Sequence, residues 1–490
     1  MWRSRWTHLV VAVAAFGGAA LTGSGVSTAN ALGRPGTGHA SVQGASAQGW
    51  LTTPSQSSFA AGVPSTGISA AAAPGAIDLP VDPSKRYQQI VGFGAALTNS
   101  SAQLIEALPA PQRAAALTAL FRPGNGAGIN VLRVVMGASD FASAPYTYDD
   151  LPLGTTDPSL VHFSVTQDEA AILPVLRQAL QINPDLVVLA TPWSAPAWMK
   201  TSGSLDSGTL QAAYYASYAE YFVRFVAAYR AAGVNVAAIS AQNEPENAAS
   251  DYPAMGLTAS AEATFIGDYL GPALAHAGLS ALKILGYDHN WSDPTFPTSL
   301  LRSSAAPYLS GTAFHCYAGD PTAQMTVHDV APTKGIWFTE CSGGSWSPDF
   351  ATNLGWNSAN LLVGTLRNWA QTMLYWNIAL NANGGPHRGG CSGCRGVITV
   401  GSDGSITRNV EFAELEQASS VVEPGATRID SPASVDGVET VAFANPDGSR
   451  AMIVDNSWGN DRVINVTDGT GRVVSTALPG GSTLSLRWTD

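Results

Sequence analysis

The sequence is poor in charged residues, which make up 12% of its 490 residues, and the formal net charge is −12. This shortage of positive charge argues against nucleic acid and anionic membranes as partners, because both repel an acidic surface. Hydrophobic residues make up 45% of the chain, which is enough for a large core and too much for a disordered protein. We therefore expect a folded monomer that acts on a neutral partner.

Long apolar runs are also scarce, and the one that stands out lies near the N-terminus. Arg3 and Arg5 precede an apolar run over residues 9–21, and Ala-Asn-Ala at residues 29–31 forms a small-x-small cleavage site. This order is typical of a secretory signal peptide, so we expect residues 1–31 to be removed and the protein to be secreted and extracellular. A membrane anchor is the alternative, but the run is shorter than the ~20 residues that cross a bilayer. No later stretch predicts a membrane span.

Cysteine is rare as well, and the chain contains four: Cys316, Cys341, Cys391 and Cys394. An even number in an exported chain predicts two disulfides. Four buried thiols are one alternative. A zinc site is another, although Cys316 and Cys341 lack the C-x-x-C spacing that such sites use.

Residues 89–408 alternate short apolar runs with longer helical stretches. Eight such runs occur, beginning near residues 91, 129, 186, 236, 282, 311, 336 and 373. Eight strand–helix repeats predict an α/β fold of the (β/α)₈ TIM barrel type. A doubly wound sheet is the alternative, but it would show a glycine-rich phosphate loop, for which Gly92-Phe93-Gly94 is too short.

The segments on either side of the barrel predict an all-β domain. Residues 409–490 alternate apolar and polar positions with period two between turns, which predicts a C-terminal β-sandwich. Residues 48–88 contain short strand-like pieces that cannot stand alone. We therefore expect them to supply the N-terminal strands of the same sandwich. Residues 32–47 are rich in Gly, Ser and Ala and are interpreted as a linker.

Two glutamates follow predicted barrel strands at the end where barrel enzymes place their catalytic groups. Glu244 comes after the fourth run in Asn243-Glu244-Pro245, and Glu340 ends the seventh run. Two carboxylates that face one pocket are what retaining glycoside hydrolysis requires. We expect Glu244 to be the acid/base and Glu340 the nucleophile, with their carboxyl groups roughly 5–5.5 Å apart. The structural alternatives are a surface glutamate near a helix cap for Glu244 and a buried ion pair with an arginine for Glu340.

Other polar and aromatic residues have the chemistry of a sugar site. Arg133 would hold the nucleophile ionised, or else form a structural ion pair with Asp140. Trp193 and Trp198 offer flat apolar faces to sugar rings, and one of them belongs to the core. Tyr317 could donate to the nucleophile, and a neutral His315 could donate into the site. The expected substrate-binding residues are Asp140, Trp193, Asn243, His315, Tyr317 and Trp376.

These residues fall within motifs whose order resembles glycoside hydrolase family 30 of clan A, the family of glucosylceramidase, β-1,6-glucanase and bacterial xylanases. The matching motifs are Gly92-Phe93-Gly94-Ala95-Ala96, Leu132-Arg133-Val134, Ser139-Asp140-Phe141, Pro192-Trp193-Ser194-Ala195-Pro196, Asn243-Glu244-Pro245, His315-Cys316-Tyr317, Thr339-Glu340-Cys341 and Trp376-Asn377. The resemblance implies a barrel joined to a β-sandwich, net retention, and neither cofactor nor metal. It also implies that Asp140, Trp193, Asn243 and Trp376 contact the sugar at subsite −1, with Asn243 donating to the 2-hydroxyl.

The chain departs from the glucosylceramidase-like members after Gly384-Gly385-Pro386, where they continue with an aromatic residue and this chain has His387. The expected substrates are therefore β-linked glycans, either a β-glucan such as β-1,6-glucan or glucosylceramide-like β-glucosides. The alternatives are a β-xylosidase or xylanase, a β-galactanase, and a non-catalytic glycan-binding protein on the same scaffold. A barrel aldolase would need a lysine at a strand end, which Lys200, Lys283 and Lys334 do not provide.

Barrel geometry also predicts the disulfide pairing. His315 and Glu340 should point into the pocket, so Cys316 and Cys341 should point away from it on neighbouring strands. Neighbouring strands lie about 4.8 Å apart, which suits the ~5.5 Å Cα separation of a disulfide. We expect Cys316–Cys341 and Cys391–Cys394 bridges. If a β-bulge spoils the alignment, Cys316 and Cys341 stay as buried thiols.

Overall fold

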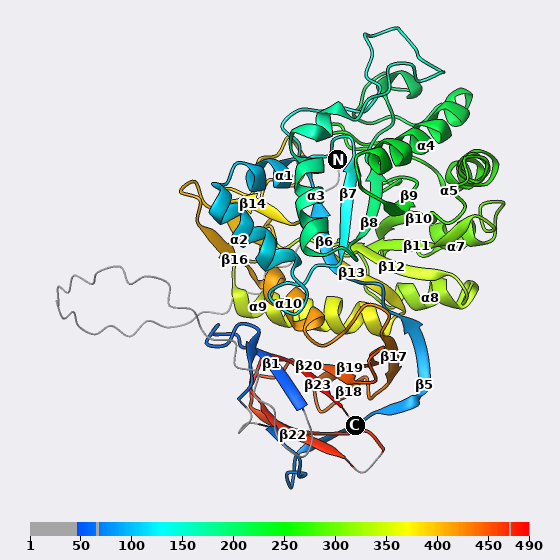
Figure 1. Cartoon of the computed structure of the whole chain (residues 1–490). Helices are drawn as coiled ribbons and strands as arrows, with labels where there is room; N and C mark the ends of the chain where they lie inside the picture. The colour runs from blue at the N-terminus through cyan, green and yellow to red at the C-terminus, as the bar shows by residue number, and fades with distance from the viewer. Residues whose placement is uncertain (1–46, 65–67, 470–471, 490) are drawn as a thin grey trace, which may run out of the picture. The chain divides into compact units, whose positions relative to one another are not determined.

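The computed structural model describes residues 47–64, 68–469 and 472–489 (Figure 1). The expected signal peptide at residues 1–31 and the linker up to residue 46 lie outside this part of the chain. Within the described ranges, no helix is both long and apolar enough to cross a membrane.

Eight parallel strands form a closed barrel, as the eight apolar runs predict. Their residues are buried almost without exception, because helices cover a parallel sheet from outside while side chains fill its interior. The fold class is confirmed. The barrel strands are β6 (Gly92–Leu97), β7 (Val131–Met136), β8 (Val187–Pro192), β9 (Val236–Ser240), β10 (Lys283–Asn290), β11 (Leu309–His315), β12 (Gly335–Glu340) and β13 (Ala370–Asn377).

Helices connect the barrel strands and present apolar faces to them. Two helical stretches contain π-helical turns, η5 (Phe265–Leu270) between α5 and α6, and η6 (Ser358–Thr365) after α9. The helices are α1 (Asn99–Glu106), α2 (Ala110–Phe121), α3 (Ile172–Ile182), α4 (Tyr215–Ala231), α5 (Ala259–Thr264), α6 (Gly271–His276), α7 (Thr295–Leu301), α8 (Ala323–Val330), α9 (Phe350–Asn357) and α10 (Val410–Ser419).

The two ends of the described chain build one β-sandwich, as expected. One sheet has the order β2-β1-β23-β20-β19-β17-β5 with β18 on β19, and the other has the order β3-β22-β21-β4. In both sheets, strands that precede the barrel pair with strands that follow it. The strands are β1 (Ala47–Thr52), β2 (Ala61–Gly62), β3 (Ile68–Ser69), β4 (Ile77–Pro80), β5 (Asp82–Gln89), β17 (Thr427–Asp430), β18 (Ser434–Val435), β19 (Val438–Ala444), β20 (Arg450–Asn456), β21 (Arg462–Thr467), β22 (Val473–Leu478) and β23 (Thr483–Trp488).

Along the chain, a small sheet and a helix lie between the last barrel strand and the C-terminal sandwich strands. A small sheet of β14 (Ala379–Asn381), β15 (Ile398–Val400) and β16 (Ile406–Arg408) follows β13 and carries the loop that contains Cys391 and Cys394. Helix α10 then contacts barrel strand β6 as well as sandwich strands β1 and β23. The boundary expected at residue 409 thus precedes a helix that touches both domains.

Both expected disulfides are present, with Cα separations of 5.3 Å for Cys316–Cys341 and 5.7 Å for Cys391–Cys394. The pairing of β11 with β12 does contain an irregularity, which shifts the register between Phe314 and His315. This shift sets His315 opposite Glu340. The residues that follow, Cys316 and Cys341, are thereby brought opposite each other. The register shift therefore aligns the two cysteines for a disulfide, whereas an irregularity at this position was expected to misalign them.

The two bridges should differ in their effect on stability. Cys316 and Cys341 are 25 residues apart, whereas Cys391 and Cys394 are 3 apart. Because a longer closed loop restricts the unfolded chain more, replacing the first pair by serine should lower the free energy of unfolding by about 3.5 kcal/mol, and replacing the second by about 2 kcal/mol. Urea unfolding of the two double variants measures the difference. An equal loss in both would contradict the loop-length argument.

Candidate active site

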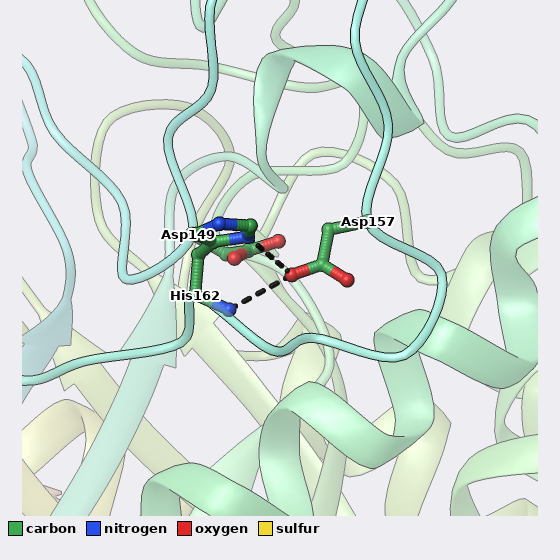
Figure 2. Close-up of side chains that lie close together, drawn as sticks. All are labelled: Asp149, Asp157 and His162. Atoms are coloured by element: carbon green, nitrogen blue, oxygen red, sulfur yellow. Dashed lines mark hydrogen bonds and ion pairs between the residues drawn. The ribbon is translucent and has the colours of Figure 1, made fainter.

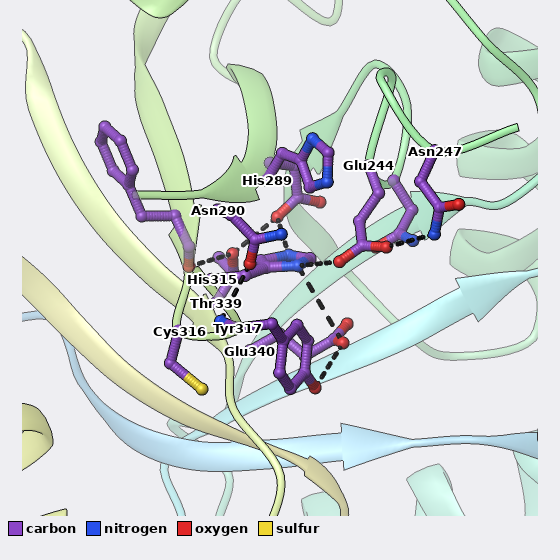
Figure 3. Close-up of polar contacts among 12 residues, drawn as sticks. Glu244, Asn247, His289, Asn290, His315, Cys316, Tyr317, Thr339 and Glu340 are labelled. Atoms are coloured by element: carbon purple, nitrogen blue, oxygen red, sulfur yellow. Dashed lines mark hydrogen bonds and ion pairs between the residues drawn. The ribbon is translucent and has the colours of Figure 1, made fainter. Parts of the chain in front are cut away.

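Glu244 stands at the carboxyl end of the fourth barrel strand in a constrained backbone. Its φ is 45°, a left-handed conformation that is uncommon for residues other than glycine and is found often at functional sites. The backbone is held because Asn243 N–H donates to the Pro192 carbonyl at 2.9 Å and Glu244 N–H donates to the Asp288 carbonyl at 3.0 Å. Asn247 then donates to Glu244 Oε2 at 2.8 Å and fixes the carboxyl group (Figure 3).

Glu340 is the last residue of β12 and is buried. Tyr317 donates to its Oε1 at 2.9 Å, which confirms the contact expected for that tyrosine, and Arg133 Nη1 contacts Oε2. One carboxylate oxygen of Glu340 lies within 4.8 Å of one of Glu244. This separation is shorter than the roughly 6.5–9.5 Å of inverting glycosidases and is close to the spacing of retaining ones.

Arg133 is the buried cation of the site. Its guanidinium donates to Asp288 and to the Asn243 side-chain carbonyl, at 2.8 Å each, and it contacts Glu340. It therefore pairs with these groups rather than with Asp140, the structural alternative expected from the sequence. Burial lowers the pKa of Arg133, but the charges of Asp288 and Glu340 outweigh that effect and raise it. The arginine is thus a permanent positive charge beside the carboxylates of Asp288 and Glu340.

Asp288, on β10, is a central residue of the site that the sequence analysis missed. It is completely buried and accepts hydrogen bonds from Arg133, Ser240 and Thr339 at 2.5–2.8 Å. Burial raises the pKa of this carboxyl, but the charge of Arg133 and the hydrogen bond from His315 hold it well below its usual range. The available signal was an acidic residue directly after the fifth apolar run, in a chain with few charges.

His315 lies between the carboxylates of Glu244 and Asp288 and contacts both. Its Nδ1 lies 3.0 Å from Glu244 Oε1, and its Nε2 lies 3.1 Å from Asp288 Oδ1. Burial lowers the pKa of His315, but the Glu340 charge and the hydrogen bonds to Asp288 and Glu244 raise it to about 9. The expectation of a neutral His315 was therefore wrong, because a ring between carboxylates binds a second proton.

The protonated histidine in turn acts on Glu244. Burial raises the pKa of the Glu244 carboxyl, but the hydrogen bond and the charge of His315 outweigh burial and lower it to about 2. Burial raises the pKa of Glu340, while the charges of His315 and Arg133 oppose that rise. In the free site one exchangeable proton is thus shared by the Glu244–His315 pair and is held on the histidine.

Above these groups lies a cavity of about 250 Å³. Trp193 and Trp376 stack on each other with ring centroids 4.9 Å apart and form an aromatic wall. Burial raises the pKa of Asp140 to about 7, although the Cys391 N–H opposes the rise, so this carboxyl can both donate and accept near neutral pH. The cavity is lined by Asp140, Trp193, Asn243, Glu244, Tyr252, Tyr317, Glu340, Trp346, Trp376, Gly390, Cys391 and Cys394. Tyr252 and Trp346 line the cavity although the sequence analysis did not single them out. His315, which was expected to bind substrate, does not line the cavity; it contacts Glu244, and Arg133 contacts Glu340.

The loop that contains the Cys391–Cys394 bridge covers the Asp140 end of this cavity. Arg388 N–H donates to the Asp140 carbonyl at 2.7 Å, and Cys391 N–H donates to Asp140 Oδ2 at 3.3 Å. Gly390 has φ +58°, and a Cβ atom there would lie 2.5 Å from the Asp140 side chain. A glycine is therefore required for the loop to approach this closely.

Trp198, one of the two tryptophans expected to stack on sugars, lies in a different group of residues. Its indole N–H donates to Asp149 at 3.1 Å. Figure 2 shows Asp149 beside Asp157 and His162, where the His162 ring Nδ1 lies 2.9 Å from Asp157 Oδ2. These contacts hold the long segment between β7 and α3 in place. Trp198 is thus the tryptophan of the pair that does not line the cavity.

A closed (β/α)₈ barrel that is joined to a β-sandwich and holds two neighbouring carboxylates at the ends of strands four and seven defines a glycoside hydrolase. The chain belongs to glycosyl hydrolase family 30. The TIM-barrel domain of that family matches residues 90–392, and its β-sandwich domain matches residues 425–486. The enzyme class expected from the sequence is confirmed, and the alternative of a non-catalytic glycan-binding protein is set aside.

The chain is similar to family members with two different named activities. The chain is 36% identical to an endo-1,6-β-D-glucanase of Aspergillus fumigatus, over 81% of this chain and 85% of the relative. It is 29% identical to the lysosomal acid glucosylceramidase of Mus musculus, over 84% and 83%. Among solved structures, an endo-β-1,6-glucanase superposes with a TM-score of 0.84 at 31% identity, over 91% of this chain and 99% of that one.

Removing the buried arginine should destabilise the protein strongly. Arg133→Ala would leave Glu340 and Asp288 as buried charges without their cation, which costs about 3–5 kcal/mol. Lys85→Ala is the matched control, because Lys85 also pairs with aspartates but its side chain is 62% exposed. Such solvent-exposed pairs contribute little to stability, because water and salt screen them. Urea unfolding of both variants tests the contrast, and similar losses would mean that the Arg133 network does not stabilise the fold.

Proposed function

We propose that this protein is a secreted monomer that hydrolyses β-1,6-glucan with retention of configuration, using Glu340 as nucleophile and Glu244 as acid/base. The observation that carries the proposal is the close approach of the Glu244 and Glu340 carboxylates, within 4.8 Å, in a family 30 barrel. The choice of β-1,6-glucan rests on greater identity to three endo-1,6-β-D-glucanases, at 34–36%, than to glucosylceramidases, at 29–32%.

Each half of the reaction uses groups that the structure brings together. In the first step a Glu340 oxygen attacks the anomeric carbon, the glycosidic C–O bond breaks, and the leaving oxygen takes a proton from Glu244. His315 shares that proton in the free site and supplies it to Glu244. In the second step Glu244 accepts a proton from water, whose oxygen displaces Glu340 and restores the β-configuration. Two inversions at one carbon give net retention.

The surrounding residues position the sugar and the nucleophile. Arg133 holds the side-chain carbonyl of Asn243, so the amide NH₂ of Asn243 is the part left to donate to the sugar 2-hydroxyl. Arg133 and Tyr317 both contact Glu340 and favour its ionised form. Trp193 and Trp376 supply an apolar surface for the sugar ring.

Secretion rests on two features of the sequence. Residues 1–31 have the pattern of a signal peptide, and two disulfides are typical of an oxidising compartment.

Product analysis on a panel of glycans tests the proposed substrate. Purified protein is incubated with β-1,6-glucan, β-1,3-glucan, xylan, β-1,6-galactan and glucosylceramide, and Glu340→Gln protein serves as the control for contaminating activity. We expect β-1,6-glucan to be cleaved at least about tenfold faster than the others, with β-configured new reducing ends in early NMR spectra. Preferred cleavage of glucosylceramide or xylan would contradict the substrate, and α-configured products would contradict the mechanism.

A further inference from the structure

A second cavity adjoins the catalytic one on the side of strands six and seven. It has a volume of about 370 Å³, larger than the 250 Å³ of the catalytic cavity, and the two share Tyr317 and Trp346. It extends from the end of β11 to helix α9. Its lining residues are Cys316, Tyr317, Cys341, Ser342, Gly343, Trp346, Ser347, Thr352, Asn353, Trp356 and Asn357.

Exposed aromatic side chains gather at this cavity. Four aromatic residues in the described part of the chain keep more than two fifths of their surface exposed: Tyr317, Trp346, Trp356 and Trp458. The first three line the second cavity, with exposed fractions of 44%, 60% and 45%, and Trp458 lies in the sandwich. Grouped exposed aromatics are unfavourable in water and mark a surface that a ligand covers.

The chemistry of the lining selects the kind of ligand. None of the eleven lining residues is charged, which excludes recognition of an ionic group by an ion pair. Hydroxyls and amides line the cavity together with the aromatic side chains, and the side-chain NH₂ of Asn357 is buried without a hydrogen-bond partner. Flat apolar faces combined with uncharged donors and acceptors suit a neutral, hydroxylated ring, which is a sugar.

The cavity is built on rigid elements. The Cys316–Cys341 bridge forms part of its wall and ties together the two strands that carry His315 and Glu340. Trp356 lies on α9, whose first turn is capped by Asp349 accepting from Thr352 N–H at 2.7 Å. Trp356 is therefore held on a helix and can bind a ring without first being ordered, which lowers the entropic cost of binding.

The position of the cavity indicates which part of a substrate it holds. The Asp140 end of the catalytic cavity is covered by the loop that contains Cys391 and Cys394. Past Tyr317 and Trp346, which line both cavities, the catalytic cavity continues into the second cavity. A glycan with one sugar against Trp376 and its scissile oxygen at Glu244 can therefore extend past Tyr317 into this space.

We propose that the second cavity is a glycan-binding subsite on the leaving-group side of the scissile bond, in which Trp346 and Trp356 stack on sugar rings beyond the point of cleavage. The inference rests on the proposed function and deepens it. The subsite makes the enzyme prefer oligosaccharides and polymers to simple β-glucosides, because only the former have rings that reach Trp356.

Trp356→Ala tests the subsite through a ratio of two activities. The ratio is kcat/KM for a β-1,6-linked glucotetraose divided by kcat/KM for 2,4-dinitrophenyl β-glucoside, which has one sugar ring. Loss of one stacking surface should lower this ratio about tenfold or more. Trp356→Phe keeps an aromatic face and should restore part of the ratio. Trp458→Ala, which removes an exposed tryptophan 51% accessible to solvent in the sandwich, is the matched control and should leave the ratio unchanged.

The cleavage pattern of glucotetraose labelled at its reducing end tests the assigned side. If Trp356 binds the leaving part, the alanine variant should cut closer to the reducing end and release shorter labelled products. An unchanged ratio would overturn the subsite, and a shift of cleavage toward the non-reducing end would overturn its assignment to the leaving-group side. Failure of the proposed function is distinguished by the wild-type protein, which would then not cleave the β-1,6-linked glucotetraose.

Discussion

Glu340→Ala is expected to lower kcat for every glycoside on the order of 10⁵-fold, the scale seen when an enzyme loses its nucleophile. Without this carboxylate no covalent intermediate can form, so a better leaving group cannot compensate. Initial rates on aryl β-glucosides with leaving groups of different pKa measure the effect. The loss should be of similar size for all of them.

The matched control for this change is Glu246→Ala. Glu246 lies in the same region as the catalytic cavity but does not line it, and its side chain is 39% exposed. This variant should keep wild-type kcat within a few-fold. We expect the Glu340→Ala protein to fold, because Arg133 keeps Asp288 as a partner. Thermal unfolding of both variants checks this. A folded Glu340→Ala protein with more than a hundredth of wild-type activity would contradict the nucleophile assignment.

Glu244→Ala is expected to divide substrates by their leaving group. Poor leaving groups need the proton that Glu244 delivers, so kcat should fall on the order of 10²–10⁴-fold for them. Dinitrophenolate leaves without protonation, so the first step on that substrate should be largely preserved. The slope of log(kcat/KM) against leaving-group pKa should therefore be steeper in the variant than in the wild type.

Azide gives this second prediction a stereochemical readout. In Glu244→Ala protein, azide can attack the glycosyl–Glu340 intermediate without base assistance and should yield the β-glycosyl azide. In Glu340→Ala protein, azide would take the place of the carboxylate and yield the α-glycosyl azide. Identical anomers from the two variants, or equal losses on good and poor leaving groups, would show that the two roles are assigned wrongly.

Much of the scaffold could be predicted because its signals are local. Each barrel strand is a short apolar run, and each run ends at the carboxyl edge where side chains of different strands meet. Knowing that edge was enough to bring Glu244, Glu340 and Trp376 to one pocket. The Cys316–Cys341 pair followed from the alternation of side chains along neighbouring strands.

What could not be predicted depends on contacts between distant segments. Asp288 lies at a strand end like the two glutamates, but its role is evident only where Arg133 and His315 meet it. The charge of His315 depends on three carboxylates from three other strands, which no local pattern reveals. Trp346 lies in a loop whose course over the barrel is set by its contact with the loop that contains Cys394.

The central claim, that Glu340 forms a covalent bond to the sugar, has one direct test. A 2-deoxy-2-fluoro-β-glucoside with a dinitrophenyl leaving group slows breakdown of the glycosyl-enzyme more than its formation, so the intermediate accumulates. Intact-protein mass spectrometry should show one added fluoroglucosyl group per chain, and peptide mapping should place it on Glu340. Attachment to any other residue, or the absence of a covalent adduct in protein that turns over the non-fluorinated substrate, would contradict the account.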